Sequence, residues 1–238
     1  MDELQRYSAL DAWFLTPQGQ ALSSAFTAEL HSAHIKRRGN YLLQIGNCGN
    51  NAWLEDMGYA AQWILAPELW DKKRGIISSI ATIPLDRESV DCIIAPLTLE
   101  LCDSECNPID ELDRILKPMG YLIFFGINPW SFWGASLRWG KLSCFAHPSA
   151  AFSSSLSLKH DMVARGYEQC WLSSFYYLPP VGSEYWLRKL EFLNQMSKMV
   201  WPYPAGFYCL VLQKQDSCIT PLSRTIHHEW HLAQINST

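Results

Sequence analysis

The sequence predicts an α/β protein with a doubly wound, seven-stranded sheet that is mostly parallel, with an antiparallel last strand and helices at the N-terminus. Short apolar runs alternate with helix-length segments along the chain. That alternation is typical of parallel sheets covered by helices. The last run, Gly206 to Gln213, shows the alternation expected of a strand in antiparallel pairing.

The clearest unit spans residues 83–125. Val90 to Ala95 is a short apolar run, as expected for a buried parallel strand. Asn107 can cap the following helix, Pro108 suits its first turn, and Pro118-Met119-Gly120 can stop it. Tyr121 to Phe125 is a second apolar strand. A crossover of this length predicts that the two strands are parallel.

The remaining elements follow from the same patterns. Residues 1–38 are expected to form two helices, broken at Pro17-Gln18-Gly19. The other expected strands are 41–45, 62–66, 76–80 and 168–177, and the other expected helices are 50–59, 155–166 and 187–199.

Composition narrows the class of protein. The 238-residue chain has 19 basic and 23 acidic residues, a net charge of -4, which gives no strong signal for nucleic-acid binding. No run of 18 apolar residues occurs, so no transmembrane helix is expected, and the first residues lack the basic start and apolar core of a signal peptide. We therefore expect a cytoplasmic protein whose eight scattered cysteines are core residues.

No metal site is expected. Cys102 and Cys106 lack a partner pair nearby. The segment His227-His228-Glu229-Trp230-His231 does not have the His-Glu-x-x-His spacing and is expected to belong to a polar tail.

Residues 83–125 resemble the second half of a class I S-adenosylmethionine (SAM)-dependent methyltransferase domain of type 11. The motifs that carry the resemblance are Ile83-Pro84, Val90-Asp91, Leu99-Glu100-Leu101 and Arg114-Ile115-Leu116-Lys117-Pro118-Met119-Gly120. Further likeness to a group of uncharacterised bacterial methyltransferase-like proteins lies in residues 128–134, 178–180, 186–192 and 205–208. The resemblance implies SAM as the cofactor.

The expected organisation follows from this resemblance. Residues 1–38 form an N-terminal helical extension, and residues 39–216 form the methyltransferase-like domain. That domain carries an aromatic insertion at 127–150 and a helical insertion at 182–204. Residues 217–238 are the tail.

The resemblance places the cofactor at the carboxyl end of the first strand, where the family has an acid and then a glycine-rich turn. Gln44 stands in place of the acid and supplies no negative charge, and Gly46 matches the first glycine. Asn47 and Cys48 follow, with Cys48 at the second glycine position. Asn50 stands at the third glycine position, where its tolerance of left-handed backbone favours the turn.

Further cofactor contacts are expected after strands two to four, at Glu68, Ser79, Ile80, Ala95 and Leu97. Glu68 lies about two positions late for the family's ribose-binding acid, so it either substitutes for that acid or is a solvated loop residue. Ser79 stands where the family often has an acid beside the adenine. Three acidic positions are thus altered, which leaves a weak, an unusual and a lost site as alternatives.

The acceptor side is less defined. The aromatic segment Asn128 to Gly134 either covers a substrate or packs the insertion onto the sheet. His147, His160, Tyr176 and Tyr177 are candidates for a base by location only. No catalytic residue is assigned.

The function expected from these features is SAM-dependent methylation of an unidentified acceptor, either a small molecule or a macromolecule, by a protein of unknown oligomeric state. The alternative is a non-catalytic methyltransferase-fold protein that serves as a binding or scaffold module, which the altered turn and the missing acids favour. A nicotinamide-dependent dehydrogenase fits poorly, because it would want Gly-x-Gly-x-x-Gly and an acid about 20 residues on.

Overall fold

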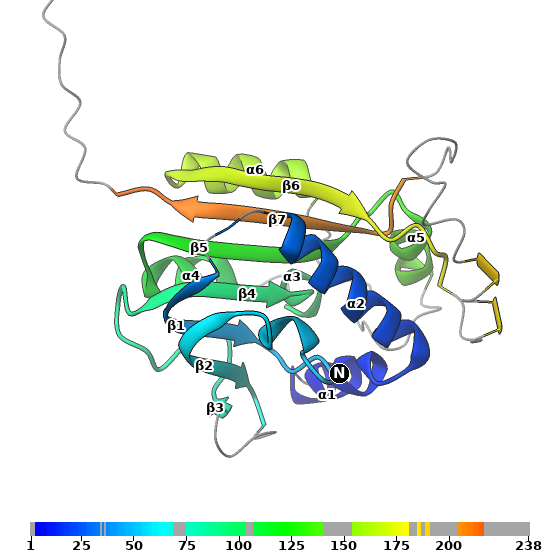
Figure 1. Ribbon diagram of the computed structural model, residues 1–238, viewed down its shortest axis with the longest axis horizontal. Helices are drawn as coiled ribbons and strands as arrows, with labels where there is room; N and C mark the ends of the chain where they lie inside the picture. The colour runs from blue at the N-terminus through cyan, green and yellow to red at the C-terminus, as the bar shows by residue number, and fades with distance from the viewer. Residues whose placement is uncertain are drawn as a thin grey trace, which may run out of the picture.

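The computed structural model describes residues 3–33, 35, 37–68, 75–102, 107–139, 154–180, 185–186, 189–190 and 204–216. A seven-stranded sheet in the order β3-β2-β1-β4-β5-β7-β6 forms its centre (Figure 1). Its strands are β1 (Arg38–Ile45), β2 (Gly58–Ala66), β3 (Gly75–Ile77), β4 (Val90–Pro96), β5 (Leu116–Ile127), β6 (Tyr167–Phe175) and β7 (Phe207–Lys214). The doubly wound fold predicted from the sequence is confirmed.

The direction of the strands also agrees with the prediction. Strands β1 to β5 pair in parallel, and β7 pairs antiparallel with both β5 and β6. The carboxyl ends of the parallel strands therefore meet at one edge of the sheet, at the right of Figure 1. We call this the carboxyl edge.

Helices cover both faces of the sheet. On one face, α1 (Glu3–Phe14), α2 (Pro17–Ser32) and α5 (Phe132–Arg138) contribute side chains to a core with β1, β4, β5 and β7. On the other face, α4 (Pro108–Ile115) and α6 (Ser155–Ala164) enclose a second core. The four-residue helix α3 (Thr98–Leu101) follows β4 directly.

The break between the first two helices lies where it was predicted. The Thr16 hydroxyl accepts a hydrogen bond from the Gly19 backbone N–H at 3.2 Å and caps α2, and Pro17 occupies the first helical position. Helix α2 is anchored by Phe26, whose ring stacks on Phe125 of β5 at a centroid distance of 4.0 Å. Aromatic burial of this size fixes α2 on the sheet.

Three predicted element boundaries are wrong. Residues 50–59 form only the 3-10 helix η1 (Ala52–Leu54), because β2 begins at Gly58 to pair with Arg38 of β1. The third strand is only three residues long, since it lies at the edge of the sheet and pairs with β2 alone. Leu116 already pairs with Val90, so β5 begins immediately after α4 without the predicted stop at residues 118–120.

One capping prediction also differs. The Asn107 side chain makes no capping hydrogen bond to the backbone of α4, and its amide instead donates to the Asp110 carboxylate at 2.9 Å. Several predictions lie outside the described residues: the tail 217–238, residues 140–150 of the aromatic insertion, and most of the expected helix 187–199.

Candidate cofactor site at the carboxyl edge

The turn after β1 is the centre of the candidate site. Strand β1 lies between β2 and β4 in the sheet, at the point where the strand order reverses. Ligands of doubly wound folds bind at this switch point. The turn takes left-handed backbone at Gly46 (φ +78°), Gly49 (φ +61°) and Asn51 (φ +47°). The prediction for Asn50 is wrong, because Asn50 is not among the described residues with positive φ and its neighbours take that conformation instead.

Gln44 is fully buried and fully bonded at the end of β1. Its amide nitrogen donates to the Gly46 carbonyl at 2.9 Å and to the Asn51 side-chain oxygen at 2.5 Å. Its amide oxygen accepts from the Trp53 indole N–H at 2.8 Å. A carboxylate could not donate the first two bonds, which explains physically why an amide stands at this position.

Asn51 organises the rest of the turn. Its side-chain oxygen accepts from the Cys48 backbone N–H at 2.9 Å, and its amide donates to the Asn47 side-chain oxygen at 2.6 Å. Cys48 is fully buried, and burial raises the pKa of its thiol, with a further contribution from the charge of Asp11. The turn is therefore held by its own polar side chains.

Helix α1 packs directly onto this turn. The Asp11 carboxylate accepts from the Gly49 backbone N–H at 2.8 Å and from the Asn47 amide at 2.7 Å. A Cβ atom at Gly46 would lie 2.8 Å from the Tyr7 ring, and one at Gly49 would lie 3.1 Å from Phe14. The Tyr7 ring at Gly46, and the Cβ and backbone of Phe14 at Gly49, thus make the close approach to backbone that glycine permits.

The loop after β3 is also tied to α1. The Ser79 hydroxyl donates to the Glu3 carboxylate at 2.9 Å. Ser79 and Ile80 line a cavity of about 160 Å³ together with Glu3, Arg6 and Tyr7. Glu68 lies two residues beyond the end of β2, where it is exposed. Of the predicted cofactor contacts, the structure brings Ser79 and Ile80 together beside α1.

The end of β4 supplies the last two predicted contacts. Leu97 is fully buried with φ +53°, and its side chain belongs to the core on the α1 side. Ala95 is equally buried but belongs to the opposite core, as does Ile80. The sheet therefore separates Ala95 from Leu97, which lies just beyond the end of β4.

Glu100, three residues beyond Leu97, is a buried acid that the sequence predicted as part of the Leu99-Glu100-Leu101 motif but not as a site residue. One carboxylate oxygen accepts from the Ile127 backbone N–H at 2.7 Å, and the other has no hydrogen-bond partner among the described residues. Burial raises the pKa of Glu100 to about 7, although the bond from Ile127 opposes this shift.

The fit of SAM can be judged from this geometry. Pockets for small ligands and cofactors measure about 300–1,000 Å³, whereas the cavity beside Ser79 measures about 160 Å³. The turn at Gly46 is covered by Tyr7, and the donors of Gln44 are used within the protein. With α1 in this position, the cavity beside Ser79 and the turn at Gly46 leave too little room for SAM.

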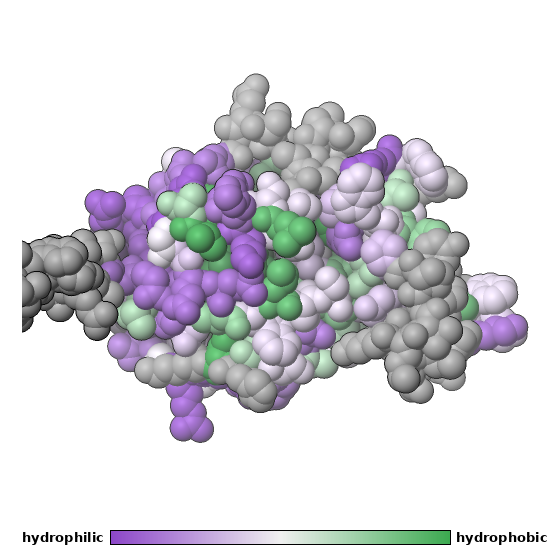
Figure 2. All heavy atoms as spheres, turned by 90° about the horizontal axis from the view of Figure 1, so that it is seen from above, coloured by the Kyte–Doolittle hydropathy of each residue, from purple (hydrophilic) through white to green (hydrophobic). Residues whose placement is uncertain are grey.

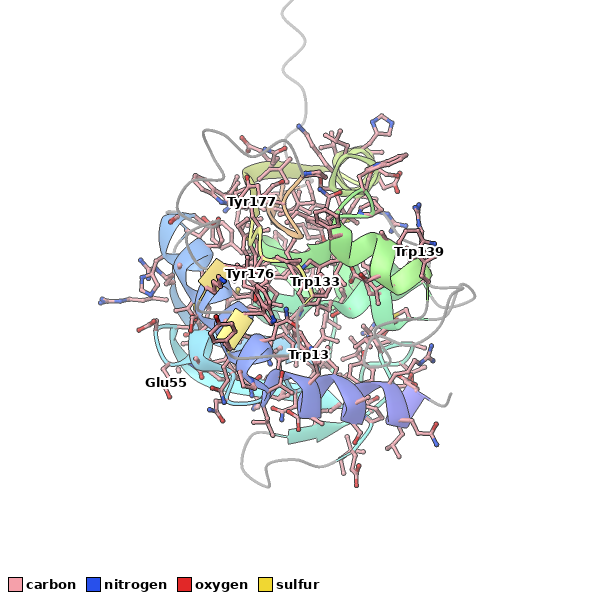
Figure 3. The ribbon with its side chains drawn as sticks, turned by 90° about the vertical axis from the view of Figure 1, so that its right-hand side faces the viewer. Trp13, Glu55, Trp133, Trp139, Tyr176 and Tyr177 are labelled. Atoms are coloured by element: carbon pink, nitrogen blue, oxygen red, sulfur yellow. The ribbon has the colours of Figure 1, made fainter. Side chains whose placement is uncertain are left out.

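Aromatic side chains gather at the carboxyl edge, where Trp13, Trp133 and Tyr176 lie close together (Figure 3). Trp133 of α5 is buried, donates its indole N–H to the Leu178 carbonyl at 2.8 Å, and meets Trp13 of α1 at a centroid distance of 5.8 Å. Trp130 and Trp139 are 78% and 73% exposed, and Figure 3 shows Trp139 at the margin of this edge. Of the three described tryptophans of the insertion, Trp133 thus lies in the core and Trp130 and Trp139 lie on the surface.

The candidate bases do not converge. Tyr176 is buried, and burial raises the pKa of its hydroxyl far above the ordinary value, which makes it a poor base at neutral pH. Tyr177 is partly exposed beside it, whereas His160 is exposed on α6 on the other face of the sheet. His147 lies outside the described residues.

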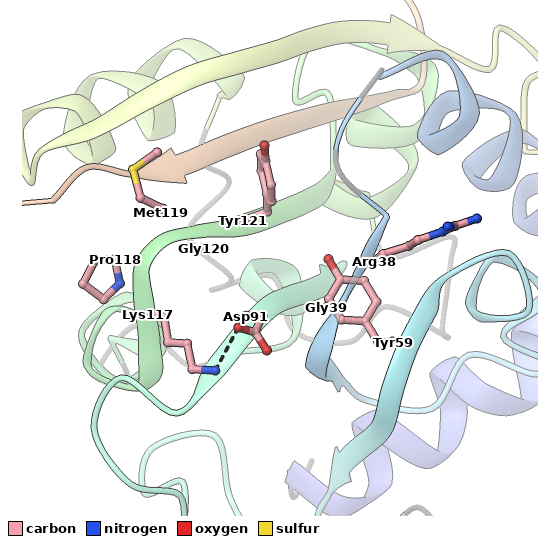
Figure 4. A pocket seen from close by; sticks show the side chains of 9 residues that line it. All are labelled: Arg38, Gly39, Tyr59, Asp91, Lys117, Pro118, Met119, Gly120 and Tyr121. Atoms are coloured by element: carbon pink, nitrogen blue, oxygen red, sulfur yellow. Dashed lines mark hydrogen bonds and ion pairs between the residues drawn. The ribbon is translucent and has the colours of Figure 1, made fainter.

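A second cavity, of about 200 Å³, lies at the opposite edge of the sheet (Figure 4). The Lys117 ammonium and the Asp91 carboxylate pair in its wall at 2.8 Å, next to Tyr59 and Tyr121. Asp91 also accepts from the Tyr41 backbone N–H at 2.8 Å, so this ion pair ties the amino ends of β1, β4 and β5 together. The cavity lies away from the switch point.

Other kinds of site can be checked over the described part of the chain. No group of histidine, cysteine and acidic side chains there could hold a metal ion. No described helix has both the length and the apolar character that crossing a membrane requires. From above the β6 edge, hydrophobic residues form small separate groups among hydrophilic ones (Figure 2).

Sequence reasoning missed the residues that matter most at this site: Glu3, Tyr7, Asp11 and Phe14 of α1, and Asn51 of the turn. An acid among the apolar positions of the first helix, Asp11 next to Leu10 and Trp13, was the available signal. It did not indicate which turn the helix would cover.

Comparison with known proteins agrees with the fold. The sequence family described as "Methyltransferase domain" matches residues 59–124. An uncharacterised Escherichia coli protein, YafS, is 28% identical over 130 residues, which cover 55% of this chain and 53% of that protein. The match therefore spans about half the length of this curated relative.

Solved structures show the same architecture. A SAM-dependent methyltransferase from Thermotoga maritima, described as a possible histamine N-methyltransferase, superposes with a TM-score of 0.61 at 18% identity, covering 90% of this chain and 99% of that one. A SAM-dependent methyltransferase from Archaeoglobus fulgidus superposes with a TM-score of 0.55 at 16% identity, covering 81% and 94%. The chain therefore has the class I SAM-dependent methyltransferase fold, and its residues 59–124 match the methyltransferase domain family.

Proposed function

We propose that the protein is a SAM-dependent methyltransferase that acts on an unidentified acceptor. The observation that carries the proposal is the left-handed turn at Gly46, which follows β1 at the switch point of a methyltransferase sheet. The match of residues 59–124 to the methyltransferase domain family supports it independently. The cofactor would lie over Gly46 and Asn47, with Ser79 and Leu97 beside it.

The proposed setting is the bacterial cytoplasm. The relative from Escherichia coli supports a bacterial origin. The free thiols of Cys48, Cys92 and Cys209 are packed as core residues, as is usual in a reducing compartment.

The test is binding of SAM and S-adenosylhomocysteine to the full chain by calorimetry, followed by transfer of labelled methyl groups to pooled candidate acceptors. A matched pair of variants sharpens it. Gly46→Ala places a Cβ in a left-handed turn at the proposed site, and Gly166→Ala does the same at φ +88° after α6, where nothing lies within 4 Å of the added atom. We expect Gly46→Ala to abolish SAM binding and Gly166→Ala to preserve it.

The second candidate function is a non-catalytic binding module. The complete use of Gln44 by protein partners and the coverage of the turn by α1 favour it. Folded wild-type protein that binds neither ligand at millimolar concentration would overturn the methyltransferase proposal and leave this candidate.

A further inference from the structure

Helix α1 spans both ends of the proposed cofactor site. At one end, Asp11 accepts hydrogen bonds from Asn47 and from the Gly49 backbone in the turn after β1. At the other end, Glu3 accepts from Ser79 in the loop after β3. The Tyr7 ring lies against Gly46, and the Cβ and backbone of Phe14 lie against Gly49. One helix thus makes the polar and apolar contacts that a bound cofactor would need with the same backbone.

The two N-terminal helices are held differently. Helix α2 is anchored on the sheet through Phe26, which stacks on Phe125 and also meets Phe175 and Phe207. Helix α1 ends at Phe14 and is joined to α2 through the exposed Leu15 and through Thr16. The connection between the helices is two exposed residues long, and beyond it Phe14 of α1 meets Phe26 of α2 at a ring-centroid distance of 6.1 Å. Displacement of α1 would therefore break the contact between Phe14 and Phe26 but not the stacking of Phe26 on Phe125.

One contact of α1, that of the Asp11 carboxylate with the turn, requires the burial of a charged group. Asp11 is buried at 6% exposure, and no described cation is hydrogen-bonded to it. Burial raises the pKa of its carboxyl group above the ordinary value, although the bonds from Gly49 and Asn47 oppose the shift. A buried carboxylate held by neutral donors is less firmly fixed than one in an ion pair.

From these observations we infer that α1 is a displaceable strap: it occupies the cofactor site in the arrangement seen here, and its docking and SAM binding exclude each other. The inference rests on the proposed function. The apparent affinity for SAM is then the intrinsic affinity reduced by the fraction of molecules in which α1 is open. Weakening the contacts of α1 should therefore tighten SAM binding.

The first test compares SAM affinity in Asp11→Ala and in wild-type protein. Asp11→Ala removes two hydrogen bonds to the turn, so we expect the apparent dissociation constant to fall roughly tenfold, which equals about 1.4 kcal/mol. Asp56→Ala is the matched control, because Asp56 is an exposed carboxylate that pairs with His31 away from the turn. An unchanged affinity for SAM in Asp11→Ala would overturn the inference, and a weaker affinity would overturn it and make Asp11 part of the wall of the site.

A second variant tests the same inference in case Asp11→Ala does not fold. Glu3→Ala removes the bond to Ser79 at the start of α1, where the Glu3 side chain is itself only partly buried. We expect the same direction of change, with a smaller size. Circular dichroism and urea unfolding would establish that both variants are folded.

The second measurement needs no cofactor. Cys48 is fully buried in the same core as Tyr7 and Phe14, so its alkylation by iodoacetamide reports the opening of α1. Cys209 on β7 is an equally buried internal reference. We expect Cys48 to react about ten times faster in Asp11→Ala, with Cys209 unchanged, when each site is followed by peptide mass spectrometry.

Failure of the strap and failure of the proposed function would give different results. Equal alkylation of Cys48 in wild type and Asp11→Ala would overturn the strap, whatever the affinity for SAM. Faster alkylation without SAM binding in any of the proteins would overturn the proposed function and the competition with it. Faster alkylation with tighter SAM binding would support both.

Discussion

Replacing Gln44 by a glutamate introduces the acid that the resemblance to class I methyltransferases leads us to expect at this position, and the structure predicts that this change destabilises the protein. The two donors of the Gln44 amide serve the Gly46 carbonyl and the Asn51 side-chain oxygen. A carboxylate would turn both hydrogen bonds into contacts between acceptors in a fully buried position. Of the three hydrogen bonds, only the one donated by the Trp53 indole N–H would remain favourable.

The size of the effect depends on pH. When the introduced carboxyl group is ionised, its charge is buried without a cation, and we expect a loss of about 3–5 kcal/mol in the free energy of unfolding. When the group is protonated, it can restore one of the two donor bonds, and the expected loss is about 1–2 kcal/mol. Burial raises the pKa of such a group, so stability is retained at low pH and lost as the pH rises through the folded-state pKa.

Urea unfolding of wild-type and Gln44→Glu protein at pH 5 and pH 8 measures this directly. The matched control is Gln62→Glu, because the Gln62 amide also donates to two carbonyls, of Leu54 and Met57, in a partly exposed position. The control should lose less stability and depend less on pH. A Gln44→Glu protein as stable as wild type at pH 8 would refute the reasoning, as would tighter SAM binding without loss of stability.

Two further predictions concern buried polar groups. Burial raises the pKa of Glu100 to about 7, so its protonated form should add about 3 kcal/mol of stability below pH 4.5, and this stability should be lost as the pH rises through 7. The Glu100→Gln variant should lack this dependence of stability on pH in urea unfolding between pH 5 and 8. An identical slope in the variant and the wild type would contradict the assignment. Trp133→Phe removes the hydrogen bond to the Leu178 carbonyl and leaves a smaller ring in the core, so the free energy of unfolding should fall by about 1–3 kcal/mol. A fall in SAM binding or methyl transfer with no loss of stability would instead make Trp133 a site residue rather than a packing residue.

The sequence predicted the sheet well because its signals are local. The apolar run at Val90 and the helix opened by Pro108 follow from side-chain periodicity and backbone preference. The error at residues 50–59 had a non-local cause, since pairing of Gly58 with Arg38 extended β2 into the expected helix. The strand at Leu116 was likewise set by its partner Val90.

The candidate site was predicted in part. The position of the turn at Gly46 followed from the order of strand and glycine, and its left-handed backbone is present. The role of Asn51 was missed, because its bonds to Gln44, Asn47 and Cys48 form only when the turn closes on itself. Whether each predicted contact meets a cofactor stays a prediction.

By itself, the sequence determined the class of fold, the strand at which the candidate site is expected and the absence from it of the acids that the resemblance implies. Those properties depend on residue type and on spacing along the chain. Only the tertiary structure decided what covers the site, because the contacts between Asp11 and Gly49 and between Glu3 and Ser79 join residues 38 and 76 positions apart. No local pattern fixes such contacts, since they arise from the packing of a whole helix against the edge of a finished sheet.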